Sequence, residues 1–277
     1  MTEASKTYQP IEDYALIGDL HTVALVGKNG SIDWCCLPRF DAPSVFGALL
    51  DAGKGGFFRI APTNTEGVKN RQLYLPETNI LLTRFLSAEG VGEITDFMPI
   101  KPAGTASHEH HIVRSVAVIQ GSLSFTLVCR PAFNYARDTH EATLCQDGVI
   151  FRSEHFSLGL ASPFPLQLDG EGGAQVTFTL KAGESVHFVL ESTTKASEQK
   201  LPLLTEKRYR LAFRVTLNYW RNWLSQCQYQ GRWREMVQRS ALVLKLLTYA
   251  PTGALVAAAT TSLPETLGGS RNWDYRY

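Results

Sequence analysis

Residues 23–34 read VALVGKNGSIDW, a pattern typical of a β-hairpin. Two runs rich in apolar residues, 23–26 and 31–34, flank the turn residues Asn29 and Gly30. Asn and Gly both tolerate the positive φ that a tight turn between antiparallel strands requires. The segment therefore predicts a β-hairpin close to the N-terminus.

The same signals continue through the first two-thirds of the chain. Further turn residues separate apolar runs, and other segments alternate apolar and polar residues with the period of two that a half-buried strand shows. The predicted hairpins are residues 81–86 with 91–94 around Glu89 and Gly90, and residues 142–145 with 149–151 around Asp147 and Gly148; the alternating strands are residues 123–127, 176–180 and 186–190. Short strands joined by turns predict an antiparallel β-sandwich.

The apolar pattern changes to a helical period near residue 200. Two amphipathic helices are predicted, and their wide apolar faces suggest packing partners beyond each other. The first covers about residues 203–226, with apolar residues Leu211, Val215, Tyr219 and Trp223 beside Ala212, Trp220 and Leu224, and with Glu206 and Arg210 spaced for an ion pair; the second covers about residues 232–249, with a predicted buried face of Trp233, Val237, Ala241, Leu244 and Thr248. Pro251 ends the second helix.

Composition excludes two classes of protein. The 277 residues contain 27 Lys and Arg against 26 Asp and Glu, a formal net charge of +1. This balance disfavours a strongly basic nucleic-acid binder and a strongly acidic solvating chain. The hydrophobic fraction of 44% and the charged fraction of 19% indicate a globular chain that buries a core. At about 150 residues per domain, the length predicts roughly two domains.

The first residues and the cysteines indicate a cellular compartment. The opening MTEASKTYQP lacks the basic start and apolar run of a secretory signal. The five cysteines, without CxxC spacing, predict neither a disulfide framework nor a zinc ribbon. We therefore expect a cytoplasmic protein. Residues 241–261 carry one charge, Lys245, but Pro251 and Gly253 interrupt them, so a buried helix and a turn are expected, with no membrane span.

Two charged clusters have a functional and a structural interpretation. The basic residues of the first helix are interpreted as a solvated face, because a nucleic-acid site needs a net positive domain. The HEHH cluster contains metal-ligand residue types, but it follows a loop-like stretch and no second ligand group stands out, so we expect neither a metal site nor a cofactor. The basic residues are Lys207, Arg208, Arg210, Arg214 and Arg221, and the cluster is His108, Glu109, His110 and His111.

Two further segments contain candidate binding residues. The loop at residues 37–44, LPRFDAPS, joins two prolines to Arg39, Phe40 and Asp41, and is either a rigid rim that reaches a partner domain or a stable turn. The run WDYRY at residues 273–277 combines rings that stack on sugars with charged groups that bind hydroxyls. Trp273, Asp274, Tyr275 and Arg276 are therefore candidate substrate-binding residues, with an interior packing segment as the alternative.

Long motifs in a fixed order resemble glycoside hydrolase family 15, the bacterial and archaeal glucoamylase and trehalase-like enzymes. The resemblance covers essentially the whole chain. The motifs are YQPIEDYALIGD at residues 8–19, NGSIDW at 29–34, LPRFDAPSVF at 37–46, LLTYAPTG at 246–253, TSLPE at 261–265 and GSRNWDYRY at 269–277.

The resemblance implies a fold of β structure followed by α structure. An N-terminal antiparallel β super-sandwich would cover residues 1–195, a linker with an amphipathic helix residues 196–230, and the truncated start of an (α/α)6 catalytic barrel residues 231–277. In the family, a Trp-x-Arg-Asp segment that holds the sugar follows the Asn-Trp-Asp-Tyr-Arg-Tyr motif, and it would begin just past the end of this chain. The first Tyr of that motif, which lines the same subsite, corresponds to Tyr275.

The resemblance also implies an activity. The family hydrolyses α-glucosidic bonds with inversion, using one Glu as acid and another to activate water. Both lie far downstream in relatives, and neither Glu235 nor Glu265 matches them, so no catalytic residue is expected here. The expectation is the N-terminal fragment of an enzyme that binds a maltodextrin, trehalose or similar α-glucoside through the missing barrel.

Two other hypotheses stay open, and neither calls for a nucleic-acid or membrane partner. The chain could be a non-catalytic β-sandwich module that binds carbohydrate or protein. It could also be a mutarotase-like enzyme whose acid and base come from residues 108–111, a reading suggested by fold analogy alone.

Overall fold

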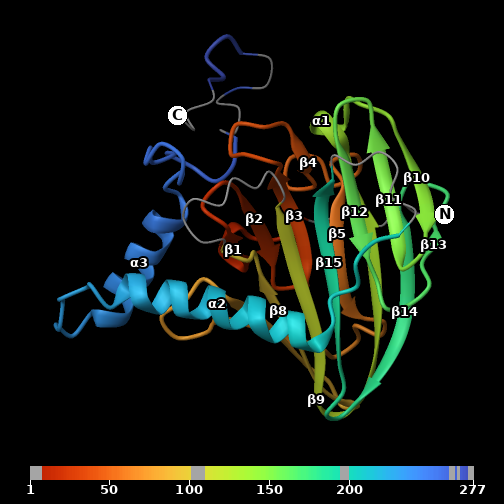
Figure 1. Ribbon diagram of the computed structural model, residues 1–277, viewed down its shortest axis with the longest axis horizontal. Coiled ribbons are helices and arrows are strands. Elements are labelled where there is room, and N and C mark those ends of the chain that lie inside the picture. Colours follow the sequence, from red (N-terminus) through yellow and green to blue (C-terminus); the bar gives the residue numbers. More distant parts are fainter. Residues whose placement is uncertain (1–7, 101–109, 194–199, 262–265, 267–268, 274–277) are drawn as a thin grey trace.

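The computed structural model describes residues 8–100, 110–193, 200–261, 266 and 269–273 (Figure 1). The strands come first and the two long helices follow them. In chain order the elements are η1 (Ile11–Asp13), β1 (Tyr14–Gly18), β2 (Val23–Gly27), β3 (Ser31–Cys36), β4 (Ser44–Phe46), β5 (Phe57–Pro62), β6 (Lys69–Tyr74), β7 (Leu81–Leu86), β8 (Gly90–Phe97), β9 (His111–Arg130), α1 (Phe133–Ala136), β10 (His140–Cys145), β11 (Gly148–Ser153), β12 (Ser157–Ala161), β13 (Gln167–Leu168), β14 (Ala174–Lys181), β15 (Ser185–Thr193), α2 (Glu206–Leu224) and α3 (Arg234–Leu246).

The strands pair antiparallel, which confirms the prediction of a mostly antiparallel β chain followed by helices. Within the described residues, 15 strands are connected, and the longest path runs β1-β2-β3-β5-β9-β15-β12-β11-β10. The three predicted hairpins are present as β2–β3, β7–β8 and β10–β11. Gly30 has φ 78° and Asp147 has φ 68°, so the predicted turns do adopt the left-handed conformation.

The 20-residue strand β9 joins the two halves of the sheet. Its first half pairs with β8 and β15, and its second half pairs with β5 and β14. Gly121 lies where the partners change, at φ 75°, and a Cβ there would collide with the carbonyl oxygen of Glu89. Glycine at this position therefore lets the adjoining turn approach β9 closely.

Apolar side chains from both halves face one core. Phe58 of β5, Phe125 of β9, Phe151 of β11 and Phe188 of β15 belong to the same buried cluster. The alternation predicted for residues 176–180 is evident in β14, where Phe178 and Leu180 are buried while Thr177 and Thr179 are exposed. Burial of these side chains removes apolar area from water and is the main stabilising contribution of this region.

A buried ion pair crosses the core of the strands. Arg114 of β9 and Asp96 of β8 are both fully buried, with 2.9 Å between Nε and Oδ1. The guanidinium also donates to the carbonyl oxygens of Phe58 and Gly30, each at 2.7 Å. One side chain thus connects β8, β9, β5 and the turn between β2 and β3.

Helix α2 lies across the strands, and α3 follows at its far end (Figure 1). The first half of α2 packs Tyr209, Phe213 and Leu217 against a cluster that includes Phe97 of β8 and Val189 of β15. The second half contributes Trp220 and Leu224 to a separate cluster with Leu242 and Leu246 of α3. The predicted ion pair of α2 is confirmed, with 2.5 Å between Arg210 Nε and Glu206 Oε1.

The helix faces differ from the sequence prediction. Trp220 and Leu224 of the expected α2 stripe are buried, as is Thr216, but Leu211 and Val215 of that stripe are exposed. The buried face predicted for α3 was wrong for Trp233 and Leu244, which are exposed; Leu242 and Leu246 are buried instead. Both helices carry apolar residues on more than one side, and contact with the strands selects the side that packs.

The chain turns back after α3. Gly253 has φ 75°, the Tyr249 N–H donates to the Ala254 carbonyl at 2.8 Å, and Thr248 pairs with Leu255. The predicted helix followed by a turn is therefore observed, although the helix ends at Leu246. No helix in the described part of the chain is long and apolar enough to cross a membrane.

Candidate functional site

Residues of the first two family motifs, 8–19 and 29–34, contact one another across the first strands. The Tyr14 hydroxyl donates to Asp33 Oδ2 at 2.7 Å, and the Ser31 hydroxyl donates to Asp33 Oδ1 at 2.5 Å. The amide of Gln9 adds a third, longer contact of 3.4 Å. Burial, followed by the hydrogen bond to Asp33, raises the pKa of the Tyr14 phenol, so it stays protonated and donates. These motif residues therefore have a structural use in closing β1 onto β3.

The loop at residues 37–44 separates its three candidate residues. Arg39 and Asp41 form a half-exposed ion pair, with 2.9 Å between Nε and Oδ1. Phe40 is buried and meets the Tyr249 ring edge-on, with 6.4 Å between the ring centroids. The Phe40 N–H donates to the His21 carbonyl at 3.0 Å. The charged residues thus face outward, while Phe40 attaches the loop to the segment that follows α3.

A cavity of about 320 Å³ opens beside this loop. Its wall combines apolar Phe133 and Phe156 with polar groups of Arg39, Asn134 and Asp138. Cavities with a mostly apolar wall and a few polar groups are typical of small-molecule sites.

Backbone in the left-handed conformation begins at Asn134, which lines this cavity. Asn134, Tyr135 and Ala136 have φ of 52°, 58° and 61°, so α1 is no regular right-handed helix. Three successive non-glycine residues in the left-handed region are rare, and such conformations cluster at functional sites. The Asn134 amide donates to Asp138 Oδ1 at 2.8 Å, which links the two ends of the short segment.

The segment after α3 is attached to the strands close to the loop. The Trp34 indole N–H donates to the Ala259 carbonyl at 2.9 Å, and the Ala250 N–H donates to the Leu20 carbonyl at 2.8 Å. These bonds join residues far apart in sequence, so they fix where the C-terminal part of the chain leaves the strands.

The candidate sugar-binding run is mostly outside the described residues. Asp274, Tyr275 and Arg276 lie there, as does Glu265. Trp273 is described and is 61% exposed, with its backbone N–H directed to the Arg271 carbonyl at 3.1 Å. Glu235 lies exposed at the start of α3.

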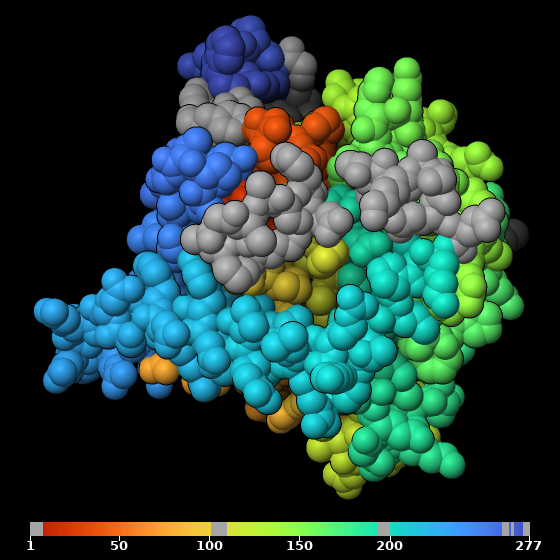
Figure 2. All heavy atoms as spheres, viewed as in Figure 1, coloured from red at the N-terminus to blue at the C-terminus, as the bar shows by residue number. Residues whose placement is uncertain are grey.

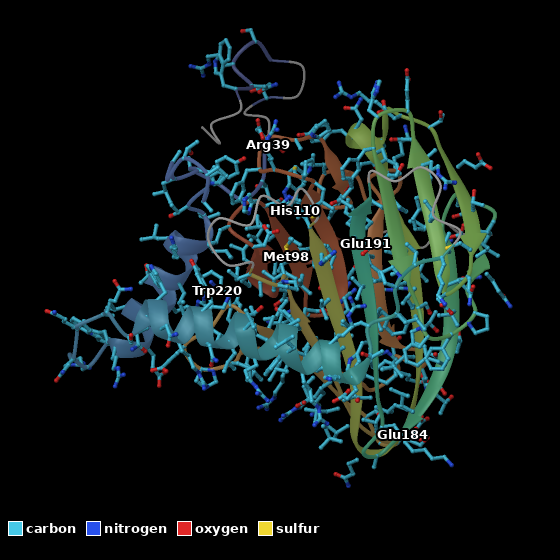
Figure 3. All side chains as sticks on the ribbon, in the orientation of Figure 1. Arg39, Met98, His110, Glu184, Glu191 and Trp220 are labelled. Atoms are coloured by element: carbon cyan, nitrogen blue, oxygen red, sulfur yellow. The ribbon has the colours of Figure 1, made fainter. Side chains whose placement is uncertain are left out.

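His110 and His111 of the histidine cluster contact different partners, while His108 and Glu109 lie outside the described residues. Nδ1 of His110 lies 2.5 Å from Asp19 Oδ2, whereas Nε2 of His111 lies 3.4 Å from Glu191 Oε2. Figure 3 shows Arg39 and His110 toward one end of the strands, far from Glu184.

Sequence reasoning missed the partners of His110. Asp19, His21 and His110 each offer one ligand atom, and the three atoms lie within 4.8 Å of one another. Asp19 and His110 are 91 positions apart, so no spacing pattern could have joined them. The only available signal was Asp19 followed by His21 directly after an apolar strand.

Comparison with known proteins identifies the family. Residues 4–212 match the family model described as trehalase-like, N-terminal, and residues 231–277 match glycosyl hydrolases family 15. The first match alone covers well over half of the chain. The two matches come in the order that the sequence motifs predicted.

Curated relatives named trehalase align with nearly the whole chain. The protein of Thermoplasma volcanium is 37% identical, covering 98% of this chain and 42% of its own length. Those of Thermoplasma acidophilum and Mycolicibacterium smegmatis are 38% and 34% identical, covering 91% and 98% of this chain and 43% of their own lengths. The chain spans less than half the length of these relatives. It belongs to the trehalase-like N-terminal family, with a C-terminal segment of glycosyl hydrolases family 15.

Proposed function

We propose that this chain is the N-terminal part of a family 15 glycosidase, and that the whole protein hydrolyses α-glucosidic bonds in trehalose, maltodextrin or a similar glucoside. One observation carries the proposal: relatives named trehalase align with up to 98% of this chain but with only 42–43% of their own lengths. The remaining length of such a protein provides room for a catalytic domain.

We assign each of the three expected segments of the chain to one part of the enzyme. Residues 1–195 would form the antiparallel β super-sandwich, residues 196–230 the linker, and residues 231–277 the start of an (α/α)6 barrel. The shared core of β5, β9, β11 and β15 supports the first assignment. The position of α2, which packs on the strands with one half and on α3 with the other, supports the second.

The residues of this chain would position the substrate and the barrel. Trp273, Asp274, Tyr275 and Arg276 would bind the sugar, and the exposed ring of Trp273 is consistent with that role. Arg39, Phe40 and Asp41 would form the rim at the domain interface, supported by the contact of Phe40 with Tyr249. Hydrolysis with inversion needs a general acid and a base that activates water, and we assign both to glutamates outside this chain.

Glucose release tests this proposal. We expect the purified 277-residue chain to release no glucose from trehalose or maltose, because both carboxylates are missing. A protein extended to the length of the relatives should release it. Because the reaction inverts only the attacked α-bond, trehalose should yield one β-glucose from the attacked ring and one α-glucose from the departing ring. Proton NMR of the early products distinguishes the anomers. Saturable glucose release by the 277-residue chain alone would disprove the assignment of both catalytic glutamates to residues outside this chain.

The cavity beside α1 favours a second function, a carbohydrate-binding module. Its volume of about 320 Å³ and its polar residues Arg39, Asn134 and Asp138 suit a small sugar. Isothermal titration of trehalose and of maltose into the 277-residue chain tests this function. Binding that Asp138→Ala removes and Trp273→Ala leaves intact would favour the module, and no binding to the cavity would exclude it.

A further inference from the structure

We propose that Asp19, His21 and His110 form a binding site for a transition-metal cation of the Zn²⁺ class. The site would present two imidazole nitrogens and one carboxylate oxygen, a ligand set that suits Zn²⁺ and its neighbours, with a further position open to water. This proposal replaces the sequence-based expectation of no metal site, and it does not depend on the proposed glycosidase function.

The positions of the donor atoms support a shared ion. The three candidate ligand atoms lie within 4.8 Å of one another. Tetrahedral Zn²⁺ with bonds of about 2.0–2.1 Å holds its ligand atoms about 3.3 Å apart, so side-chain adjustments of about 1 Å would close the site. Asp19 and His110 are both buried, and His21 is half-buried. A buried cluster loses little hydration when it binds an ion, because its groups are already largely removed from water.

One hydrogen bond orients the His21 ring. Nδ1 of His21 lies 3.2 Å from the Asp19 carbonyl oxygen. A carbonyl only accepts hydrogen bonds, so Nδ1 is the donor in this contact and Nε2 is the nitrogen left to ligate an ion. Metal-ligating histidines are commonly held in this way by a carbonyl or carboxylate at the other nitrogen.

The contact between His110 and Asp19 is where an ion would enter. Nδ1 and Oδ2 are 2.5 Å apart, so these two candidate ligand atoms already face each other. An ion bound to both atoms would move them apart to the spacing of metal ligands. Oδ1 of Asp19 stays in place because it accepts the N–H groups of His21 and Thr22, at 3.0 and 3.1 Å.

The site lies where three parts of the chain meet. Asp19 and His21 occupy the turn between β1 and β2, and His110 precedes β9 and receives the Ser192 N–H on its carbonyl at 3.1 Å. The edge of the Tyr249 ring faces His21, with 5.8 Å between the ring centroids. A bound ion would thus tie the strands to the segment that follows α3 and stabilise their junction.

Titration of the untagged, metal-free chain with ZnCl₂ tests the proposal. We expect one saturable site per chain by calorimetry and a rise in Tm with added Zn²⁺. Mg²⁺ should not compete, because it prefers oxygen ligands. Co²⁺ should give visible d–d absorption without the near-ultraviolet band of a cobalt–thiolate bond. That last measurement separates this site from the five cysteines, none of which forms a disulfide.

Variants locate the ion. We expect His21→Ala to weaken Zn²⁺ binding by at least about 100-fold, beyond the loss typical of an outer-shell substitution. His155→Ala is the matched control, since that imidazole is exposed and is not one of the three candidate ligands, and it should bind like the parent chain. Asp19→Asn, which keeps the shape of the side chain, is a second variant, and circular dichroism checks that both variants fold. No saturable binding, a thiolate band, or unchanged binding by folded His21→Ala would overturn the proposal.

Discussion

The strands and helix α3 differ in how completely they bury their large apolar side chains. In the strand body, defined as β1–β15 with the residues of α2 that pack on them, Trp34, Phe58 and Phe125 are fully buried. At α3, by contrast, Trp233 directly before the helix and Met236 and Leu244 within it are 54%, 67% and 52% exposed. We call these three residues the open face of α3. Figure 2 shows α2 and the turn into α3 projecting beyond the strands.

This difference separates a self-contained region from one that lacks a partner. The core of the strand body packs within the described residues, whereas the open face of α3 borders shallow grooves lined by Val243, Val237 and Ser240. Contiguous exposed apolar area of this kind marks interaction surfaces. In our proposal, the rest of the catalytic barrel covers it.

The largest expected effect contrasts two tryptophans. Trp220 of α2 is fully buried, so Trp220→Ala should lower the free energy of unfolding by about 3–5 kcal/mol. Trp233→Ala on the open face should change it by less than about 0.5 kcal/mol. Urea unfolding followed by circular dichroism measures both. Equal losses would mean that the open face is packed in solution, and the comparison would then fail.

The next effect concerns the buried ion pair of the strand body. Arg114→Leu leaves the Asp96 carboxylate and the Phe58 and Gly30 carbonyls without their partner, and should cost about 3 kcal/mol of unfolding free energy. Arg84→Leu, which breaks a partly exposed pair with Glu93, is the control and should cost less than about 1 kcal/mol.

The double variant completes this experiment. Arg114→Leu combined with Asp96→Leu should recover part of the loss, because no charge then stays buried. A loss for Arg114→Leu as small as that for Arg84→Leu would show that the interior of the strand body tolerates an unpaired carboxylate.

A smaller, pH-dependent effect is expected where α2 begins. Nε2 of His187 lies 2.7 Å from Glu206 Oε2, and this hydrogen bond, followed by that of Arg210, lowers the pKa of Glu206 below its ordinary value of 4.5. A lowered folded-state pKa stabilises the fold above the ordinary value, and the contribution is lost as the pH falls through the folded-state value. Because Glu206 is half-exposed, we expect less than about 1 kcal/mol.

Comparison with Glu206→Gln measures this contribution. The difference in unfolding free energy between the parent chain and Glu206→Gln should be constant near neutral pH and shrink below pH 4.5. Glu235→Gln on α3 is the control for loss of one carboxylate. A difference that grows on acidification would contradict the assigned direction.

Serine substitutions on the open face test it directly and should have the smallest effect on stability. Met236→Ser with Leu244→Ser should reduce binding of an apolar fluorescent dye while changing stability by less than about 0.5 kcal/mol. Leu73→Ser, at an exposed position on β6, is the control and should reduce dye binding less. A parent chain that binds no dye and melts in one sharp transition would contradict an uncovered apolar face.

Much of the strand structure could be predicted because its signals are local. A turn such as Asn29-Gly30 requires residues that accept positive φ, and alternation along β14 reports which face is buried. The ion pair of Glu206 and Arg210 follows from helical spacing alone. These features depend on residues within a few positions of one another, so the sequence displays them directly.

Tertiary contacts decided what local patterns leave open. Trp220 and Leu242 are buried while Leu211 and Trp233 are exposed, although all four lie on apolar sides of their helices, because the strands cover one side only.

The candidate sites show the same limit. Residue types and the family motifs identified Arg39, Phe40 and Asp41, but only the fold turned Phe40 inward onto Tyr249. The sequence by itself therefore determined the strands, the helices and the family. Folding alone determined which helix faces are buried and which distant side chains, such as Asp19 and His110, meet, because both depend on long-range packing.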